Sequence, residues 1–264
     1  MQAEVGIIGG TGLYDPKLLK NAQEIEVNTP YGAPSDAFTV GELAGRKVAF
    51  LARHGRKHTI RPTDVNSRAN MFAFKKLGVR WLLAVSTVGS LKEEYKPGEL
   101  AFVDQFIDRT TKREQSFYTQ DKVCHISVAD PMCPEMRKVL LDVAKKAKIF
   151  AHPTATYICI EGPRFSTKAE SKLFQQWGAD VVGMTLVPEC VLAREAELCY
   201  ASIATVTDYD CWKDHPVTTE EIVTTMKANV EKVKKLVTET VAKLPAEQSC
   251  HGCGCKDALK SALI

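Results

Sequence analysis

Val5-Gly6-Ile7-Ile8-Gly9-Gly10-Thr11-Gly12 joins a short apolar run to a glycine-rich turn near the start of the chain. The apolar part predicts a buried strand, and the turn offers backbone N–H groups with little side-chain bulk around them. A dinucleotide-binding fingerprint is excluded because its third glycine would fall on Asp15, and a P-loop is excluded because no Gly-Lys-Ser/Thr follows. A loop that binds a single phosphate through backbone N–H groups and the Thr11 hydroxyl stays open, as does a plain tight turn.

A second apolar run, Val48-Ala49-Phe50-Leu51-Ala52, leads into the basic stretch Arg53-His54-Gly55-Arg56-Lys57-His58. Taken alone, such a stretch is typical of a solvated surface loop. In open α/β sheets, however, ligands gather beyond the carboxyl ends of the strands, and both candidate pieces directly follow a strand. Together they predict an anion site suited to phosphate.

Apolar strand-like runs alternate with helix-like segments along the rest of the chain. Gly78 and Gly178 stand at two expected helix ends, and Thr218-Thr219-Glu220-Glu221 resembles a capping box. This alternation predicts an α/β fold with a largely parallel sheet. The expected strands cover residues 5–8, 48–52, 81–86, 100–104, 155–160, 180–183 and 201–207, and the expected helices cover 66–77, 134–148, 167–177, 188–198 and 219–244.

The bulk composition sets the broad class of the protein. The chain has 264 residues, of which 45% are hydrophobic, so it can bury a sizeable core. Its net charge of +3 comes from nearly equal numbers of acids and bases, which argues against a nucleic-acid partner. There is no apolar run long enough to span a membrane and no secretory signal at the N-terminus. We therefore expect a soluble, cytoplasmic protein without a membrane partner.

Two segments at expected strand ends carry polar or aromatic side chains. Ser86-Thr87-Val88-Gly89-Ser90 offers hydroxyls to an oxyanion, although a plain turn between strand and helix fits equally well. Glu161-Gly162-Pro163-Arg164-Phe165-Ser166 also follows a strand. Its Phe165 is either a stacking surface for a flat ligand or a core residue.

Val206-Thr207-Asp208-Tyr209-Asp210-Cys211-Trp212 is the most pointed motif, because an apolar strand ends in two acids one residue apart. Two such carboxyls are not easily both buried and ionised. Asp208 and Asp210 are therefore candidates for a proton donor with a raised pKa and a partner that orients it or binds an amino group. The alternative is a solvated turn.

Two further regions stand out by composition. Residues 104–129 are polar and lack helical periodicity, which in a compact domain favours a functional loop. Cys250-His251-Gly252-Cys253-Gly254-Cys255 gathers three thiols and an imidazole near the C-terminus. A metal site, a disulfide and a flexible reduced tail are all open, since a closed zinc site normally needs a second, distant ligand pair.

Over nearly its whole length, the chain resembles the trimeric purine nucleoside phosphorylase family, and within it the members that cleave S-methyl-5′-thioadenosine. The motifs that carry the resemblance are Gly6–Gly12, Leu51–Arg56, Asp104–Thr110, Ile160–Ser166, Trp177–Asp180, Met184-Thr185 and Thr207–Asp210. The resemblance implies one α/β domain over residues 1–245, with a twisted mixed central sheet flanked by helices. Residues 246–264 are then a cysteine-containing C-terminal tail.

The activity implied by the resemblance is phosphorolysis of methylthioadenosine to adenine and 5-methylthioribose 1-phosphate, in methionine and purine salvage. Inorganic phosphate is a co-substrate, and neither a metal nor an organic cofactor is expected for the reaction. Asp208 and Asp210 are the implied catalytic residues. The implied phosphate ligands are Thr11, Arg53, His54, Ser86, Thr87 and Thr185. The implied nucleoside contacts are Phe165, Ser166, Met184, Asp208, Tyr209, Asp210, Thr219, Ile222, Val223 and His125.

The resemblance also bears on specificity and assembly. An acid at position 208, where phosphorylases for 6-oxo purines have an Asn, implies a preference for adenine. Thr219 stands where some relatives have an apolar residue, so adenosine is a possible second substrate. A neighbouring subunit is implied to contribute the segment around Cys124-His125, hence a homotrimer or a dimer of trimers. Cysteine-rich tails of some heat-adapted relatives form disulfides.

The remaining alternatives are a phosphorylase for 6-oxo purine nucleosides or methylthioinosine and, more distantly, a nucleotide-binding redox module.

Overall fold

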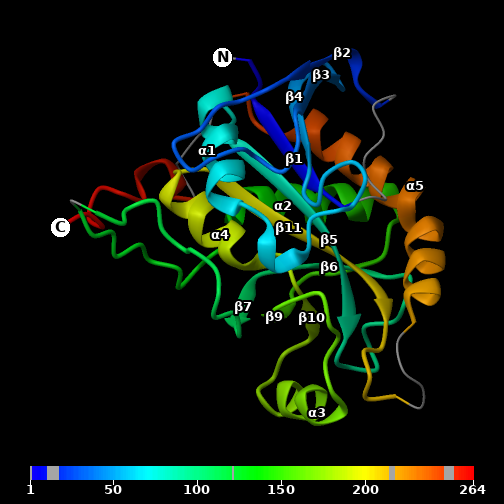
Figure 1. Cartoon of the computed structure of the whole chain (residues 1–264). Helices are drawn as coiled ribbons and strands as arrows, with labels where there is room; N and C mark the ends of the chain where they lie inside the picture. Colours follow the sequence, from blue (N-terminus) through cyan, green and yellow to red (C-terminus); the bar gives the residue numbers. More distant parts are fainter. Residues whose placement is uncertain (1, 11–17, 121, 214–217, 247–252) are drawn as a thin grey trace.

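The computed structural model describes residues 2–10, 18–120, 122–213, 218–246 and 253–264. An eleven-stranded mixed sheet forms its centre (Figure 1). Four parallel strands make up the middle of this sheet, namely β1 (Val5–Gly9), β4 (Arg46–Ala52), β5 (Trp81–Ser90) and β11 (Cys199–Asp208). Their near-continuous apolar sequences fit this position, because helices cover both faces of the sheet. The α/β class and the mixed central sheet are thus confirmed.

The sheet is larger and less parallel than the alternation pattern predicted. The other strands are β2 (Lys20–Ile25), β3 (Phe38–Leu43), β6 (Leu100–Phe102), β7 (Gln105–Asp108), β8 (Ala151–His152), β9 (Thr156–Cys159) and β10 (Val181–Gly183). The sequence analysis missed β2, β3, β7 and β8. β2 is exposed and polar, and β8 has only two residues, so neither carries an apolar strand pattern.

The segment after Ser86 is not the turn that was considered. Residues 87–90 continue β5, because Gly89 and Ser90 pair with Val182 and Val181 of the antiparallel β10. β5 thereby contacts β1, β10 and β11 and becomes the central strand of the sheet.

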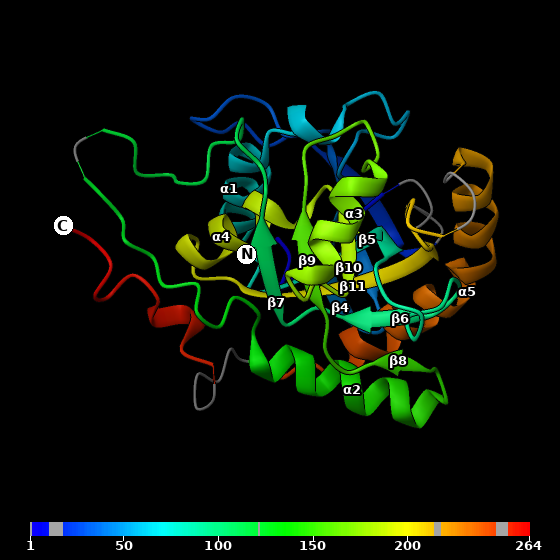
Figure 2. The same ribbon diagram turned by 90° about the horizontal axis from the view of Figure 1, so that it is seen from below.

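Five α-helices flank the sheet in the described residues. α1 (Ser67–Leu77) and α4 (Leu186–Glu195) pack together on one face, and α2 (Pro134–Ala147) and α5 (Thr219–Lys243) pack together on the other. α3 (Lys168–Gln176) covers a third, smaller apolar cluster (Figures 1 and 2). Each face of the sheet therefore buries its own core.

Local sequence signals account for several helix boundaries. The predicted capping box at the start of α5 is confirmed, since the Thr218 side chain accepts from the Glu221 N–H and the Glu221 side chain accepts from the Thr218 N–H. Thr167 makes the same arrangement with Glu170 at α3. Gly78 ends α1 with φ of 89°, a conformation that glycine adopts without strain. No helix in the described ranges is both long and apolar enough to cross a membrane.

The C-terminal segment is anchored in the body of the protein at Cys255 and then extends away from it beside a loop (Figure 2). Residues 253–264 run beside the loop around Cys124, where Val123 and Ile264 exchange backbone hydrogen bonds (Figure 2). The Cys255 side chain is buried in the core beneath α2 and α5. A flexible tail is therefore wrong for these residues, while Cys250 lies outside the described part of the chain.

Candidate active site

A cavity of about 770 Å³ opens beyond the carboxyl ends of the central strands. The parallel register sets Gly9 beside both Ala52 and Val85. The next residues along these three strands, Gly10, Arg53 and Ser86, therefore meet at one level of the sheet, and all three line the cavity. The expected lining residues found there are Arg53, His54, Ser86, Thr87, Phe165, Ser166, Met184, Thr185, Asp208, Asp210, Thr219, Ile222 and Val223.

Arg53 holds a buried positive charge at one end of the cavity. Its Nε and Nη2 donate to the two carboxylate oxygens of Glu189 at 2.5 and 3.0 Å, and its Nη1 donates to the Val85 carbonyl at 2.8 Å. Arg53 is 2% exposed and Glu189 is 1% exposed. Burial works to lower the pKa of Arg53, but Glu189 outweighs it, so the net pKa is raised and the guanidinium stays charged. The bidentate pair also fixes the direction of the side chain.

His54 lies beside Arg53 as a neutral ring. Burial, together with the Arg53 charge, lowers the pKa of His54 to about 4. Its Nδ1 lies 3.0 Å from the Ile60 carbonyl oxygen, which can only accept, so the proton is assigned to Nδ1. This leaves Nε2 as an acceptor, able to receive a hydrogen bond from a P–OH group.

Three hydroxyl residues complete this end of the cavity. Ser86 and Thr87 come from β5, and Thr185 is the residue directly before α4. The Thr185 side chain makes no capping bond to the helix. Thr11, the other expected member of this group, lies outside the described residues.

Asp208 ends β11 at the other end of the cavity. Its Oδ2 accepts from the Thr207 hydroxyl at 2.7 Å, and its Oδ1 accepts from the Asp210 N–H at 2.8 Å. These bonds favour the ionised form, yet burial outweighs them and raises the pKa of Asp208 to about 6. Asp208 can therefore carry a proton near neutral pH.

Asp210 is the second carboxyl and is 5% exposed. It accepts a hydrogen bond from the Ser171 hydroxyl of α3, and burial raises its pKa. The Ser166 hydroxyl lies beside Asp210, where it favours the ionised carboxylate, and it also lines the cavity. Two adjacent carboxyls of this kind suit one proton donor and one acceptor.

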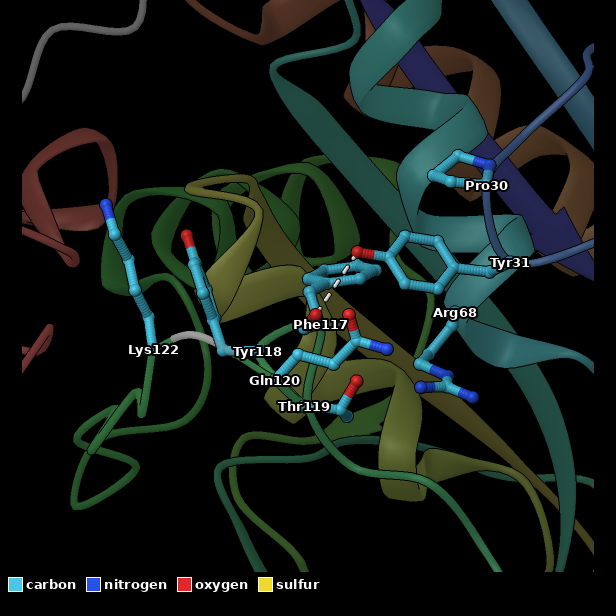
Figure 3. A pocket seen from close by; sticks show the side chains of 8 residues that line it. All are labelled: Pro30, Tyr31, Arg68, Phe117, Tyr118, Thr119, Gln120 and Lys122. Carbon is cyan, nitrogen blue, oxygen red and sulfur yellow. Dashed lines mark hydrogen bonds between the residues drawn. The ribbon is translucent and has the colours of Figure 1, made fainter.

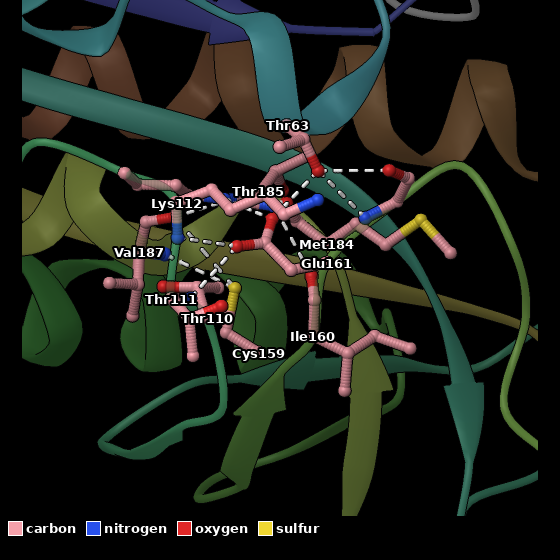
Figure 4. Close-up of polar contacts among 12 residues, drawn as sticks. Thr63, Thr110, Thr111, Lys112, Cys159, Ile160, Glu161, Met184, Thr185 and Val187 are labelled. Carbon is pink, nitrogen blue, oxygen red and sulfur yellow. Dashed lines mark hydrogen bonds and ion pairs between the residues drawn. The ribbon is translucent and has the colours of Figure 1, made fainter.

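The loop around Glu161 ties the polar segment 104–129 to the cavity. Glu161 accepts from the Thr63 hydroxyl at 2.7 Å and from the Thr111 and Lys112 N–H groups at 2.9 Å (Figure 4). Burial opposes ionisation, but these bonds outweigh it and lower the pKa of Glu161 to about 2. Arg113 reaches from Glu161 to the Met184 carbonyl at 2.7 Å. The polar segment thus holds a residue that lines the cavity.

One face of α5 forms an apolar wall of the cavity. The resemblance implied Thr219, Ile222 and Val223 there, but not Met226 and Val230. These five positions follow helical spacing, so continuing the pattern along the helix would have found the other two. Phe165, which is 43% exposed, lines the same cavity.

Two of the expected contact residues are not among those that line the cavity. The Tyr209 hydroxyl donates to the Glu93 carbonyl at 3.4 Å, and its ring contacts Trp212, so its side chain is held by residues outside the cavity. His125 is exposed on the loop beside the C-terminal segment, where its N–H donates to the Ala262 carbonyl. Arg56 of the basic stretch binds Glu24 and Asp36 instead of turning to the cavity.

A second hollow, of about 640 Å³, lies between Tyr31 and the segment 117–122 (Figure 3). The Tyr31 hydroxyl donates to the Phe117 carbonyl there, and Arg68 lies over the Tyr31 ring. It contains none of the predicted site residues. The cavity at the strand ends is therefore the candidate active site.

Comparisons with known proteins show what the chain is similar to over nearly its whole length. The model of the phosphorylase superfamily matches residues 4–242. The S-methyl-5′-thioadenosine phosphorylase of Nitrosopumilus maritimus is 54% identical, over 98% of this chain and 97% of that protein.

Two solved structures from Schistosoma mansoni are also similar. A methylthioadenosine phosphorylase in complex with adenine is 38% identical and covers 98% of this chain and 96% of its own, with a TM-score of 0.92. A single-site mutant of an adenosine/methylthioadenosine phosphorylase, in complex with methylthioadenosine, is 39% identical with the same coverage and a TM-score of 0.91.

Proposed function

The chain belongs to the S-methyl-5′-thioadenosine phosphorylases of the phosphorylase superfamily, and from this premise we propose how its cavity carries out the reaction. The enzyme transfers the 5-methylthioribosyl group of methylthioadenosine from adenine to inorganic phosphate, a step in methionine and purine salvage. The observation that carries the proposal is a single cavity with a buried cation at one end and two carboxyls of raised pKa at the other.

Phosphate binds at the Arg53 end in this proposal. Arg53 donates charge-assisted hydrogen bonds, Ser86, Thr87 and Thr185 donate through their hydroxyls, and His54 accepts from the P–OH group. Thr11 is the further expected ligand. Holding phosphate below C1′ of the ribose sets up in-line attack and stabilises the positive charge that develops on the sugar.

The purine binds at the Asp208 end. As the C1′–N9 bond breaks, its electron pair moves into the base, and a protonated Asp208 gives its proton to N7. Ionised Asp210 accepts from the 6-amino group, and the Ser166 hydroxyl lies beside the base. A 6-oxo purine offers an acceptor where Asp210 requires a donor, so the pair favours adenine over hypoxanthine and guanine.

The sugar and its 5′ substituent lie between these ends. Met184 packs against the ribose and Phe165 against the purine face. The methylthio group occupies the apolar wall formed by Ile222 and Val223, which suits a group without hydrogen-bonding capacity.

A homotrimer, alone or stacked as a hexamer, is also part of the proposal. It is supported by the exposed loop around His125, which extends from the body together with the C-terminal segment (Figure 2). In the assembly, His125 of a neighbouring subunit closes the 5′ end of the cavity. Sedimentation velocity measures the oligomeric state directly, and a monomer with full activity would contradict this assignment. We also place the enzyme in the cytoplasm.

Product analysis tests the proposed function. Methylthioadenosine, adenosine and inosine are each incubated with the enzyme, with and without phosphate, and the free base and sugar phosphate are quantified. We expect adenine and 5-methylthioribose 1-phosphate only when phosphate is present. Adenine release without phosphate would indicate hydrolysis, a faster reaction with inosine would indicate a 6-oxo purine phosphorylase, and no release would indicate a binding module.

A further inference from the structure

Four cysteines converge on one buried point on the face of the sheet covered by α2 and α5, apart from the active-site cavity. Cys133, Cys199, Cys253 and Cys255 have Sγ atoms that all lie within 4.8 Å of one another. The first two are 1% and 0% exposed, and Cys255 is 2% exposed. Cys253 and Cys255 thus meet the distant second pair that their own sequence motif lacks.

The geometry of the cluster points to a ligand. A tetrahedral Zn²⁺ with Zn–S bonds of about 2.3 Å separates its sulfurs by about 3.8 Å. The Cys199 and Cys253 sulfurs lie 3.7 Å apart. Two disulfides require closeness only within each pair, whereas a shared metal ion requires all four sulfurs to be mutually close, as they are here.

The supporting structure holds the four side chains in place. Cys133 is the residue before α2, and its N–H donates to the Tyr200 carbonyl at 2.8 Å. Cys199 begins β11, and its N–H donates to the Arg80 carbonyl at 2.8 Å. Gly254 has a φ of 58° between the other two cysteines, in the left-handed region that glycine adopts readily. Three segments far apart in sequence are therefore fixed around one point.

Two features place positive potential beside the cluster. Arg194 of α4 directs its Nη1 to the Cys255 sulfur at 3.6 Å. The N-terminus of α2 adds positive potential beside Cys133. Zn²⁺ with four thiolates carries a charge of −2, which the arginine and the helix end partly compensate.

We propose that Cys133, Cys199, Cys253 and Cys255 bind one structural Zn²⁺ ion that fastens the C-terminal segment to the body. On binding, the thiols lose their protons to solvent and no electron is transferred. Four sulfur ligands leave no open coordination position, so the site has no catalytic role. The fastened segment in turn holds the loop around Cys124 through the hydrogen bonds between Val123 and Ile264.

Metal analysis of the full-length protein tests the proposal. The protein is expressed with zinc supplementation, purified without chelators, and assayed for metal by mass spectrometry. We expect about one zinc per chain, retained on dialysis and released by a thiol-specific mercurial. The double variant Cys253→Ser/Cys255→Ser should lose the metal, while the control Cys124→Ser, outside the cluster, should keep it.

A second measurement uses the wild-type protein, so its result does not depend on whether the double variant folds. Growth with Co²⁺ in place of Zn²⁺ should give a protein with sulfur-to-cobalt charge-transfer absorption and the visible bands of a tetrahedral site. Peptide masses showing a disulfide among these four cysteines, four alkylated thiols without metal, or undiminished zinc in the double variant would each overturn the proposal.

Discussion

The two ends of the active-site cavity hold ionisable groups under opposite constraints. At one end, Arg53 is locked in a bidentate pair with Glu189, and its pKa is raised, so its charge does not change with pH. At the other end, Asp208 and Asp210 are held by hydroxyl and backbone N–H groups instead of a cation. Burial then raises the pKa of Asp208 to about 6. One end keeps a fixed charge for an anion, and the other keeps a proton that can move.

The difference has a structural origin. Both groups follow parallel strands at the same edge of the sheet, so the strand register brings them into one cavity. α4 passes behind Arg53 and supplies a buried acid, Glu189. Behind Asp210 lies α3, which supplies the neutral Ser171. The helix behind each end thus decides whether its charge is fixed or titrates.

Removing the movable proton should have the largest effect. Asp208→Asn keeps a hydrogen-bond donor but has no proton to give, so we expect kcat with methylthioadenosine to fall ~10²–10⁴-fold. The KM for phosphate should change little, because Arg53 is untouched. Steady-state kinetics measure both constants, with Asp142→Asn, an exposed acid on α2, as the control. A kcat near the wild-type value would remove Asp208 from the mechanism.

The pH dependence checks the same assignment. A general acid must be protonated, so kcat/KM should fall as pH rises through the pKa of Asp208, which is about 6 in the unliganded enzyme. Phosphate ionises in the same pH range, so kcat/KM is measured against pH for wild type and Asp208→Asn at the same phosphate concentrations. Only the wild type should show a further fall in kcat/KM beyond the fall that both enzymes share.

Thermal stability gives an independent readout of the Asp208 pKa. Because the folded-state pKa is raised, the folded protein binds more protons than the unfolded chain between pH about 4 and about 6, so this group costs stability as pH rises through that window. Asp208→Asn should therefore melt no lower than wild type at pH 8. A lower melting temperature would show that the loss of turnover reflects damage to the fold.

Removing the counter-charge of Arg53 should mainly lower the free energy of unfolding. Glu189→Gln leaves the buried Arg53 without its counter-charge, and we expect a loss of about 3–5 kcal/mol in the free energy of unfolding. Phosphate should recover part of this loss, because it supplies a new anion to Arg53. Urea unfolding with and without phosphate measures both effects.

The matched control for Glu189→Gln is Glu239→Gln. Glu239 pairs with Lys235 at 4.0 Å on the surface of α5, with 42% of its side chain exposed. It should change stability by less than about 1 kcal/mol. Equal losses in the two variants, or no added protection by phosphate in Glu189→Gln, would contradict the special role of the Arg53–Glu189 pair.

The two carboxyl residues of the cavity could be predicted from the sequence. Asp208 and Asp210 stand out because an apolar strand ends in two acids one residue apart. The chain turns after Asp208, and the bond from the Asp210 N–H to the Asp208 Oδ1 keeps the two residues together at the cavity. Arg53 was found because it directly follows a buried strand. Short-range sequence patterns are enough to predict site residues where the ends of neighbouring strands bring those residues together.

The residues that hold these side chains in place could not be predicted from short-range sequence patterns. Glu189 lies 136 positions from Arg53, and Ser171 lies 39 positions from Asp210. Neither residue carries a local signal of its role, because the packing of α3 and α4 onto the sheet creates these contacts. The same holds for Cys133 and Cys199, whose closeness to the C-terminal cysteines depends on where α2 and β11 begin. Side-chain packing at long range therefore accounts for most of what was missed.

Displacing the carboxyls without changing them should have an intermediate effect. A methyl group added at Gly89 would lie 2.8 Å from the Asp208 Oδ1 and 3.2 Å from the Asp210 Cβ, so Asp208 must move. We expect Gly89→Ala to lower kcat by ~10–100-fold. Gly45→Ala, in a turn with open space around it and φ of 78°, should cost stability but leave kcat unchanged. Equal kcat in both variants would mean that the Asp208 position tolerates displacement.

The smallest expected effect concerns the wall between the two ends. Thr219 lines the cavity at the start of α5, about one helical turn before the apolar Ile222 and Val223 that line it too. Thr219→Val keeps the shape and removes the hydroxyl, so kcat/KM for adenosine should fall about tenfold relative to methylthioadenosine. Thr224→Val, an exposed position on the same helix, should leave this ratio unchanged. Because neither end of the cavity is altered, a parallel loss with both substrates would assign Thr219 to the start of the helix instead of to the recognition of the 5′ group.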